Sequence, residues 1–91
     1  MTRVLMYCTA ACPFCQSAER LLVEKGASIE KVRVDLEPGR RGEMTQKSGG
    51  RYTVPQIWIG ERHIGGCDDL YALDRKGGLD SLLQVTPKAT P

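Results

Sequence analysis

The segment 4–35 limits the fold of this chain more than any other feature of the sequence. A short apolar run at 4–7 is followed by a helical pattern that begins at Pro13, and a second strand-like segment follows at 29–35. A strand, a helix and a strand in this order form a βαβ unit, in which the two strands run parallel. We therefore expect an α/β domain built around a parallel strand pair.

The helical pattern has clear boundaries. Ala18, Leu21 and Leu22 have the spacing of one apolar face of an amphipathic helix. Pro13 suits the first helical position, because its missing N–H needs no partner there. Gly26 suits the end, since glycine readily takes the left-handed conformation that closes many helices. The sequence predicts a helix between these two residues.

The second strand alternates in its later half. Val32, Val34 and Leu36 stand on one side, and Arg33 and Asp35 stand on the other. Successive side chains of a strand point to opposite faces. We expect the three apolar side chains to face the same way.

A helix and a hairpin follow. The polar stretch 37–47 contains two glycines and predicts an irregular helix that ends at 48–50. Residues 56–59 and 62–64 predict a β-hairpin, with glycine at the first position of a two-residue turn. A Gly-Gly pair then ends the second strand of the hairpin.

The last helix begins after this pair. Asp68 or Asp69 is expected to cap it, and Gly77 and Gly78 are expected to end it. Three leucines within 79–83 are expected to cover an edge of the core.

The complete order is strand–helix–strand–helix–strand–strand–helix, which predicts a mixed four-stranded sheet flanked by helices. Ninety-one residues provide one modest hydrophobic core. We expect a single domain at 1–83. The remaining segment, 84–91, has two prolines and no periodicity, and we expect it to be a flexible tail.

Charge and hydropathy argue against two classes of partner. Thirteen Lys and Arg residues balance eleven Asp and Glu, for a net charge of +2, which favours neither nucleic acid nor a membrane surface. No apolar run approaches the ~18 residues of a membrane span. The start of the chain also lacks the apolar segment of a signal peptide. We expect a cytoplasmic protein.

The four cysteines carry the chemistry, because cysteines in a reducing compartment are metal ligands or redox groups. Cys12 precedes Pro13 and so takes the N-cap of the predicted helix. There the unpaired N–H groups and the helix dipole lower a thiol pKa. Cys15 lies one turn later, close enough for the two sulfurs to bond. The pair predicts an accessible nucleophile, Cys12, and a resolving thiol, Cys15.

Metal binding is the alternative role for these cysteines. Cys8, Cys12 and Cys15 have the C-x3-C-x2-C spacing of iron–sulfur enzymes that use S-adenosylmethionine, but those enzymes need a far larger barrel. Cys67 could complete a four-thiolate zinc or iron–sulfur site. However, structural zinc ligands usually come in two close pairs, and Cys67 stands alone. We expect no bound metal, and we expect Cys8 to be a small buried apolar residue.

Three motifs in order resemble the glutaredoxin family: Cys-Pro-Phe-Cys at 12–15, Thr-Val-Pro-Gln-Ile-Trp-Ile at 53–59 and Gly-Gly-Cys-Asp-Asp-Leu at 65–70. The resemblance extends over 4–83 and is greatest to the bacterial dithiol class of glutaredoxin 3. It implies a thioredoxin fold, no bound cofactor and glutathione as the reducing co-substrate. It also implies that Cys12 is the nucleophile and Cys15 the resolving thiol.

The resemblance further implies a glutathione site. Val54-Pro55 would be a cis peptide that pairs with the cysteinyl part of glutathione. Backbone N–H groups at the start of the last helix would bind the γ-glutamyl carboxylate, and Asp69 would bind the ammonium group. The expected glutathione-binding residues are Pro13, Phe14, Arg51, Thr53, Val54, Pro55, Gly66, Cys67, Asp68 and Asp69.

Two positions depart from the family pattern. Glutaredoxins commonly have Lys or Arg three residues before the first active-site cysteine, where this chain has Thr9. Arg51 or Lys47 would then have to supply the charge. Phe14 replaces the commoner tyrosine and keeps its apolar ring. Cys67 is typical of the bacterial class, and it either packs beside glutathione or forms a regulatory disulfide.

The implied activity is a glutathione-dependent thiol–disulfide oxidoreductase, acting as a monomer on protein disulfides and on glutathionylated proteins in cell redox homeostasis. One alternative is a glutaredoxin-like electron donor to ribonucleotide reductase that thioredoxin reductase reduces; the glutathione-type motif at 65–69 argues against it. The other is a glutathione-ligated [2Fe–2S] carrier. Such carriers usually have glycine and serine where this chain has Pro13 and Cys15.

Overall fold

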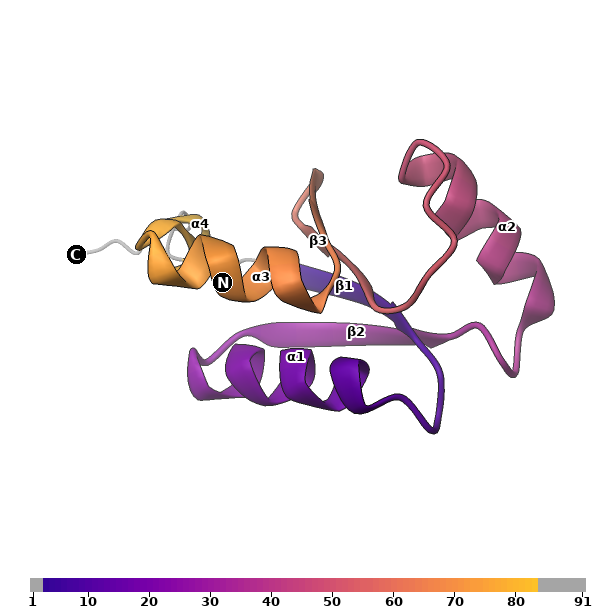
Figure 1. The fold of residues 1–91 in the computed structure, drawn as a ribbon, viewed down its shortest axis with the longest axis horizontal. Coiled ribbons are helices and arrows are strands. Elements are labelled where there is room, and N and C mark those ends of the chain that lie inside the picture. The colour runs from indigo at the N-terminus through magenta and orange to yellow at the C-terminus, as the bar shows by residue number, and fades with distance from the viewer. Residues whose placement is uncertain (1–2, 84–91) are drawn as a thin grey trace.

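The computed structural model describes residues 3–83, which form a four-stranded mixed sheet with helices on both faces (Figure 1). The strand order is β2-β1-β3-β4. β1 pairs parallel with β2 and antiparallel with β3, and β3 pairs antiparallel with β4. The elements are β1 (Arg3–Cys8), α1 (Pro13–Glu24), β2 (Ser28–Arg33), α2 (Pro38–Lys47), β3 (Gln56–Ile59), β4 (Arg62–Gly65), α3 (Cys67–Arg75) and α4 (Gly78–Leu83). The predicted βαβ unit, the hairpin and the mixed sheet are confirmed.

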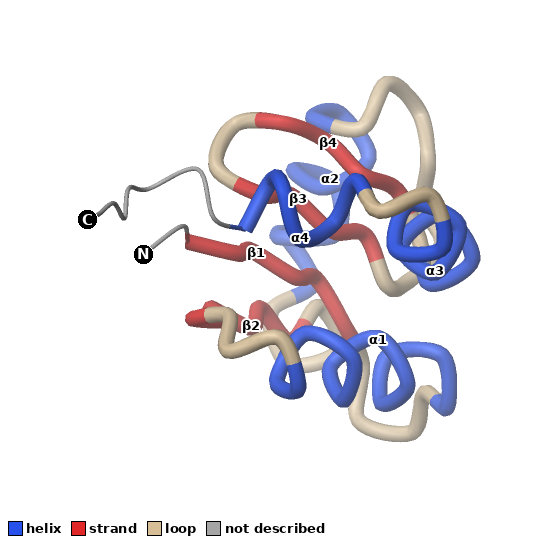
Figure 2. Tube along the Cα trace, turned by 90° about the vertical axis from the view of Figure 1, so that its left-hand side faces the viewer, coloured by secondary structure: helices blue, strands red, loops and turns tan. Residues whose placement is uncertain are grey.

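The alternation of side chains along β1 divides the core between the two faces of the sheet. Val4, Met6 and Cys8 pack on the face that α1 and α3 cover, together with Leu22 and Leu70. The tube in Figure 2 shows these two helices on the same side of the strands.

The other face has a smaller core beneath α2. Tyr7 lies there with Val32, Met44 and Trp58. Tyr7 donates a hydrogen bond to Glu43 of α2, and burial, the largest cause, raises its pKa to about 12 together with this bond. The hydrogen bond therefore attaches α2 to the central strand.

The second strand is shorter than predicted. It ends at Arg33, because the N–H groups of Leu36 and Glu37 both turn back to the Arg33 carbonyl. Asp35 bonds the Arg33 guanidinium at 2.7–2.8 Å and accepts the Ala10 N–H. As a result Val34 remains buried but Leu36 is 68% exposed, so the expectation that Leu36 faces the same way as Val32 and Val34 is wrong.

The helices differ from the predictions in three details. α2 is a continuous helix of ten residues, because Pro38 starts it and Met44 anchors it in the core. The N-cap of α3 is Gly66, neither Asp68 nor Asp69. The leucines expected to cover the core lie on an additional short helix, α4, where Leu79 is fully buried.

Within residues 3–83, no helix is long and apolar enough to cross a membrane. The expected flexible tail at 84–91 lies outside the described residues.

Candidate active site

The candidate site begins at the N-terminus of α1, where Cys12 is the N-cap as predicted. Cys12 has an extended backbone, and its Sγ accepts the Cys15 N–H at 3.1 Å. Pro13 is the first helical residue, so its missing N–H leaves no donor without a partner. The Cys12 sulfur thus lies at the N-terminal end of α1, beside the first N–H groups of the helix.

The site is less open than the sequence suggested. Cys12 is only 7% exposed, whereas the neighbouring Phe14 ring is 61% exposed. The Cys12 Sγ lies 4.0 Å from the Val54 carbonyl oxygen, which closes one side of the sulfur. The expectation of an accessible thiol is not met in this structure, because Cys12 is buried against the Val54 loop.

Cys15 has the environment of a thiol that stays protonated. It is 4% exposed and points from α1 into the core. Burial, the largest cause, raises the pKa of Cys15 to about 12, and the hydrogen bond with Cys12 adds to the increase. The two thiols thus differ in environment, with Cys12 at the helix end and Cys15 behind it.

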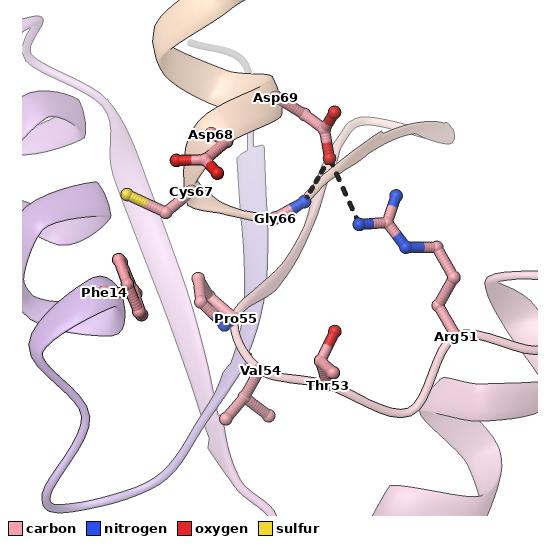
Figure 3. A pocket seen from close by; sticks show the side chains of 9 residues that line it. All are labelled: Phe14, Arg51, Thr53, Val54, Pro55, Gly66, Cys67, Asp68 and Asp69. Atoms are coloured by element: carbon pink, nitrogen blue, oxygen red, sulfur yellow. Dashed lines mark hydrogen bonds and ion pairs between the residues drawn. The ribbon is translucent and has the colours of Figure 1, made fainter.

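The Val54–Pro55 peptide bond is cis, as the resemblance implied. This loop precedes β3, and it lies between the first turn of α1 and the start of α3 (Figure 3). It brings Val54 to Cys12 and Pro55 to Gly66, where a Cβ on the glycine would lie 3.3 Å from the Pro55 carbonyl oxygen. The motif at 53–59 therefore lies against Cys12 on one side and against the motif at 65–70 on the other.

A cavity of ≈ 370 Å³ is lined by Val54, the residue whose carbonyl contacts Cys12, whereas neither Cys12 nor Cys15 lines it. Figure 3 shows side chains from α1, the Val54 loop and α3 around it. Nine of the ten residues expected to bind glutathione line this cavity: Phe14, Arg51, Thr53, Val54, Pro55, Gly66, Cys67, Asp68 and Asp69. Pro13 does not line it. Three segments that are far apart in the sequence thus form one concave surface.

Asp69 organises the polar end of the cavity. Its Oδ2 accepts the Gly66 N–H at 2.9 Å and the Arg51 guanidinium at 3.2 Å, the two dashed lines in Figure 3. The bond from Gly66 is the largest of the causes that lower the pKa of Asp69, and Arg51 lowers it further. The carboxylate is therefore charged at neutral pH and available to a cation.

Of the two basic residues considered for this cavity, the structure places Arg51 there. Lys47 instead lies over the rings of Trp58 and Tyr7 on the other side of the sheet, with its Nζ 4.8 Å from the Trp58 ring centroid. This cation–π arrangement leaves Arg51 as the cation beside Asp69.

A polar connection that the sequence did not predict lies behind the cavity. Gln56 is fully buried. Its Nε2 donates to the Thr53 hydroxyl at 3.3 Å, and its Oε1 lies 2.8 Å from the His63 Nε2. His63 stacks on Trp58 with ring centroids 4.5 Å apart. The available signal was an amide residue in an otherwise apolar strand.

This stacking also holds His63, the only histidine of the sequence, which would lie exposed on a hairpin without such a partner. His63 is instead partly buried against Trp58. Trp58 itself is 5% exposed and belongs to the core. Across 3–83, no group of three or more His, Cys, Asp or Glu side chains is placed to hold a metal ion.

Comparison with known proteins identifies the family of this site. The glutaredoxin family model matches residues 4–64. The chain belongs to the glutaredoxin family. It is 52% identical to a glutaredoxin of Pseudomonas aeruginosa over 93% of this chain and 100% of that protein. It is 51% identical to glutaredoxin 3 of Escherichia coli over 92% of this chain and 100% of that protein.

Solved glutaredoxin structures have the same fold. The solution structure of a glutaredoxin from Brucella melitensis is 46% identical and superimposes with a TM-score of 0.81, covering 98% of this chain and 96% of that one. A crystal structure of a buckwheat glutaredoxin in complex with glutathione is 28% identical, with a TM-score of 0.85, and covers 92% and 78% of the two chains. These findings confirm the thioredoxin-type fold, and the family supports thiol–disulfide exchange as the general chemistry.

Proposed function

We propose that this glutaredoxin reduces mixed disulfides between proteins and glutathione, and disulfides within proteins, with glutathione as its reductant. The observation that carries the proposal is the cavity beside Cys12, which is apolar near Phe14 and Pro55 and charged at Asp69 and Arg51. A γ-glutamyl tripeptide has matching groups: a thiol, an ammonium and two carboxylates.

Each end of glutathione has a proposed partner. The γ-glutamyl ammonium binds the Asp69 carboxylate, and the γ-glutamyl carboxylate binds the N–H groups of Cys67 and Asp68 at the start of α3. The Gly66 N–H keeps its bond to Asp69. The glycine carboxylate binds Arg51, which serves in place of the basic residue that Thr9 replaces. The cysteinyl backbone pairs with Val54 beside the cis peptide.

The proposed reaction on a glutathionylated protein uses one thiol. The Cys12 thiolate attacks the glutathione sulfur of the mixed disulfide, so that a Cys12–glutathione bond forms and the client leaves as a thiolate, which takes up a proton. A second glutathione thiolate then attacks the glutathione sulfur. Glutathione disulfide leaves, and Cys12 returns as a thiolate.

Protein disulfides need both thiols. Cys12 attacks one client sulfur and forms a mixed disulfide, and the first client thiol leaves. Cys15 then attacks the Cys12 sulfur and gives its proton to the second departing client thiolate. The Cys12–Cys15 disulfide that results is reduced by two molecules of glutathione.

The test compares Cys12→Ser with Cys15→Ser in two assays coupled to glutathione reductase and NADPH. Cys12→Ser is expected to lose turnover with both a glutathione mixed disulfide and a protein disulfide. Cys15→Ser is expected to keep turnover of the mixed disulfide and to lose most turnover of the protein disulfide. Equal losses for the two variants in the mixed-disulfide assay contradict the one-thiol reaction. Reduction by thioredoxin reductase without glutathione favours the alternative electron donor.

We further propose a cytoplasmic monomer whose clients include ribonucleotide reductase. Glutaredoxins typically have a reduction potential of about −200 to −230 mV, which is close to the potential of a cytoplasmic glutathione pool. Sedimentation measures the mass directly, and a dimer at micromolar concentration contradicts the monomer.

A further inference from the structure

Cys8 is a buried thiol that the proposed reaction does not use. It is the last residue of β1 and is 4% exposed. The alternation along β1 turns it to the same side as Val4 and Met6, the face that α1 covers. Cys15 is the first buried residue of α1 on its inner side. The strand end and the helix start therefore direct Cys8 and Cys15 into one core cluster.

A second cavity, of ≈ 240 Å³, is lined by both Cys8 and Cys15. It lies between the first turns of α1 and the ends of β1 and β2, and it shares no lining residue with the cavity beside Cys12. Cys15 can thus be approached from two directions, from Cys12 on one side and from Cys8 on the other.

Charged side chains surround the second cavity. Lys31 and Arg33 line it from β2, and Glu19 lines it from α1, with Lys31 and Glu19 paired at 3.1 Å. Burial raises the pKa of the Cys8 thiol, and the positive charges of Lys31 and Arg33 act against that increase. A thiolate formed at Cys8 during exchange therefore has two cations nearby.

We propose that Cys8 is a third redox thiol, which exchanges with the active-site disulfide at Cys15. The proposal rests on the Cys12–Cys15 disulfide that the proposed function produces. The Cys8 sulfur attacks the Cys15 sulfur, the Cys8–Cys15 bond forms and the Cys12–Cys15 bond breaks. Cys12 leaves as a thiolate and accepts the proton that Cys8 has lost. The protein contains one disulfide before and after the exchange, so its oxidation state does not change and no external oxidant is needed.

The exchange has a consequence for the catalytic cycle. Once Cys15 is bonded to Cys8, Cys12 is free again at the N-terminus of α1. The oxidised protein then reacts through one thiol, although the resolving thiol is occupied. Cys8 thereby converts the two-thiol enzyme into a one-thiol enzyme.

Alkylation of the oxidised protein tests the exchange. Iodoacetamide is added to the Cys12–Cys15 disulfide form of the native-sequence protein without denaturant or reductant, and the products are mapped by peptide mass spectrometry. Because alkylation is irreversible, it is expected to accumulate a species with alkylated Cys12 and a Cys8–Cys15 disulfide. The matched variant Cys8→Ala is expected to lose this species and to keep Cys12 protected.

Two further variants make the result decisive. Cys67→Ala is expected to label at Cys12 as the native sequence does, because the exchange does not involve Cys67. In Cys12→Ser, oxidation by glutathione disulfide is expected to give a Cys8–Cys15 disulfide, a mass loss of two hydrogens with no glutathione retained. Cys8→Thr serves if Cys8→Ala does not fold.

Equal alkylation of Cys12 in the native sequence and in the Cys8 variant overturns the proposal. So does a Cys12→Ser protein in which Cys15 carries glutathione or bonds Cys67. Glutathione-coupled turnover is measured on the same preparations. Labelling without turnover contradicts the proposed function alone, and turnover without Cys8-dependent labelling contradicts the exchange alone.

Discussion

At the scale of single residues, Asp69 is held in place at the polar end of the cavity that Phe14 and Pro55 line. One of its oxygens accepts both the Gly66 N–H and the Arg51 guanidinium. Asp69 and Arg51 are each nearly half exposed, so their ion pair contributes at most ~1 kcal/mol to folding. The carboxylate can therefore accept a ligand ammonium at little cost in stability.

We predict that Asp69→Asn raises the KM for a glutathione mixed disulfide roughly tenfold. A hydrogen bond to a charged group contributes ~1.5 kcal/mol or more. The bond is present in both the ground state and the transition state, so kcat is expected to change little. Steady-state kinetics with Glu61→Gln, in the β3–β4 turn, provides the matched control. An unchanged KM in Asp69→Asn removes this residue from the proposed ligand set.

At the scale of elements, the junction between β4 and α3 fixes Asp69. Gly65 has a φ of +116°, a value that residues other than glycine rarely adopt. A Cβ at this position would collide with the Asp69 carboxylate and lie 2.9 Å from the Arg51 Nη1. The strand can pass directly into the helix start only because no side chain is present.

Gly65→Ala is accordingly predicted to lower the free energy of unfolding by about 1–3 kcal/mol and to raise the KM for the mixed disulfide. Gly42→Ala is the control, since a methyl group there would meet no atom within 4 Å in an α2 position of ordinary φ. It is expected to gain about 0.5–1 kcal/mol. Urea unfolding measures both, and a fully stable Gly65→Ala would mean that the junction tolerates a side chain.

The elements also mark how far the sequence alone could predict this molecule. Pro13, Gly26 and the leucine spacing act locally, and they gave α1 and the βαβ unit correctly. β2 ends early in a turn in which the Leu36 and Glu37 N–H groups bond the Arg33 carbonyl. Asp35 in this turn also accepts the Ala10 N–H across 25 residues, a contact that no local pattern indicates. Likewise, Arg51 and Lys47 are both basic residues that lie close together in the sequence, and the sequence does not tell which of them lies beside the cavity. Only the packing of Lys47 over Trp58 distinguishes them.

At the scale of the whole molecule, the stability of the fold depends on pH through His63 and through three carboxylates. Burial lowers the pKa of His63, and Arg51 lowers it further while Asp69 opposes the decrease. The folded protein thus binds this proton less readily than the unfolded chain, whose histidine pKa is ~6.5. Stability associated with neutral His63 is present above that pH and is lost as the pH falls towards the folded value.

We expect the free energy of unfolding to fall in two stages during acidification. The first begins below about pH 6.5 and is due to His63. The second begins below about pH 4, as Asp69, Glu43 and Asp35, whose pKa values are all lowered in the fold, take up protons. Urea unfolding followed by circular dichroism measures both. His63→Phe, which cannot titrate, is expected to lose only the first stage. If the first stage persists in this variant, another group is responsible for it.

The stacking of His63 on Trp58 has one more consequence, for how the molecule can be observed. Trp58 is the only tryptophan of the chain, and it faces away from the thiols, beneath α2. Through His63 and Gln56 it connects to Thr53 at the edge of the cavity. Intrinsic fluorescence is therefore expected to act as a built-in optical readout of ligand entry. Titration of Cys12→Ser with glutathione should change the emission without any attached dye, and an unchanged spectrum would show that this polar connection transmits nothing.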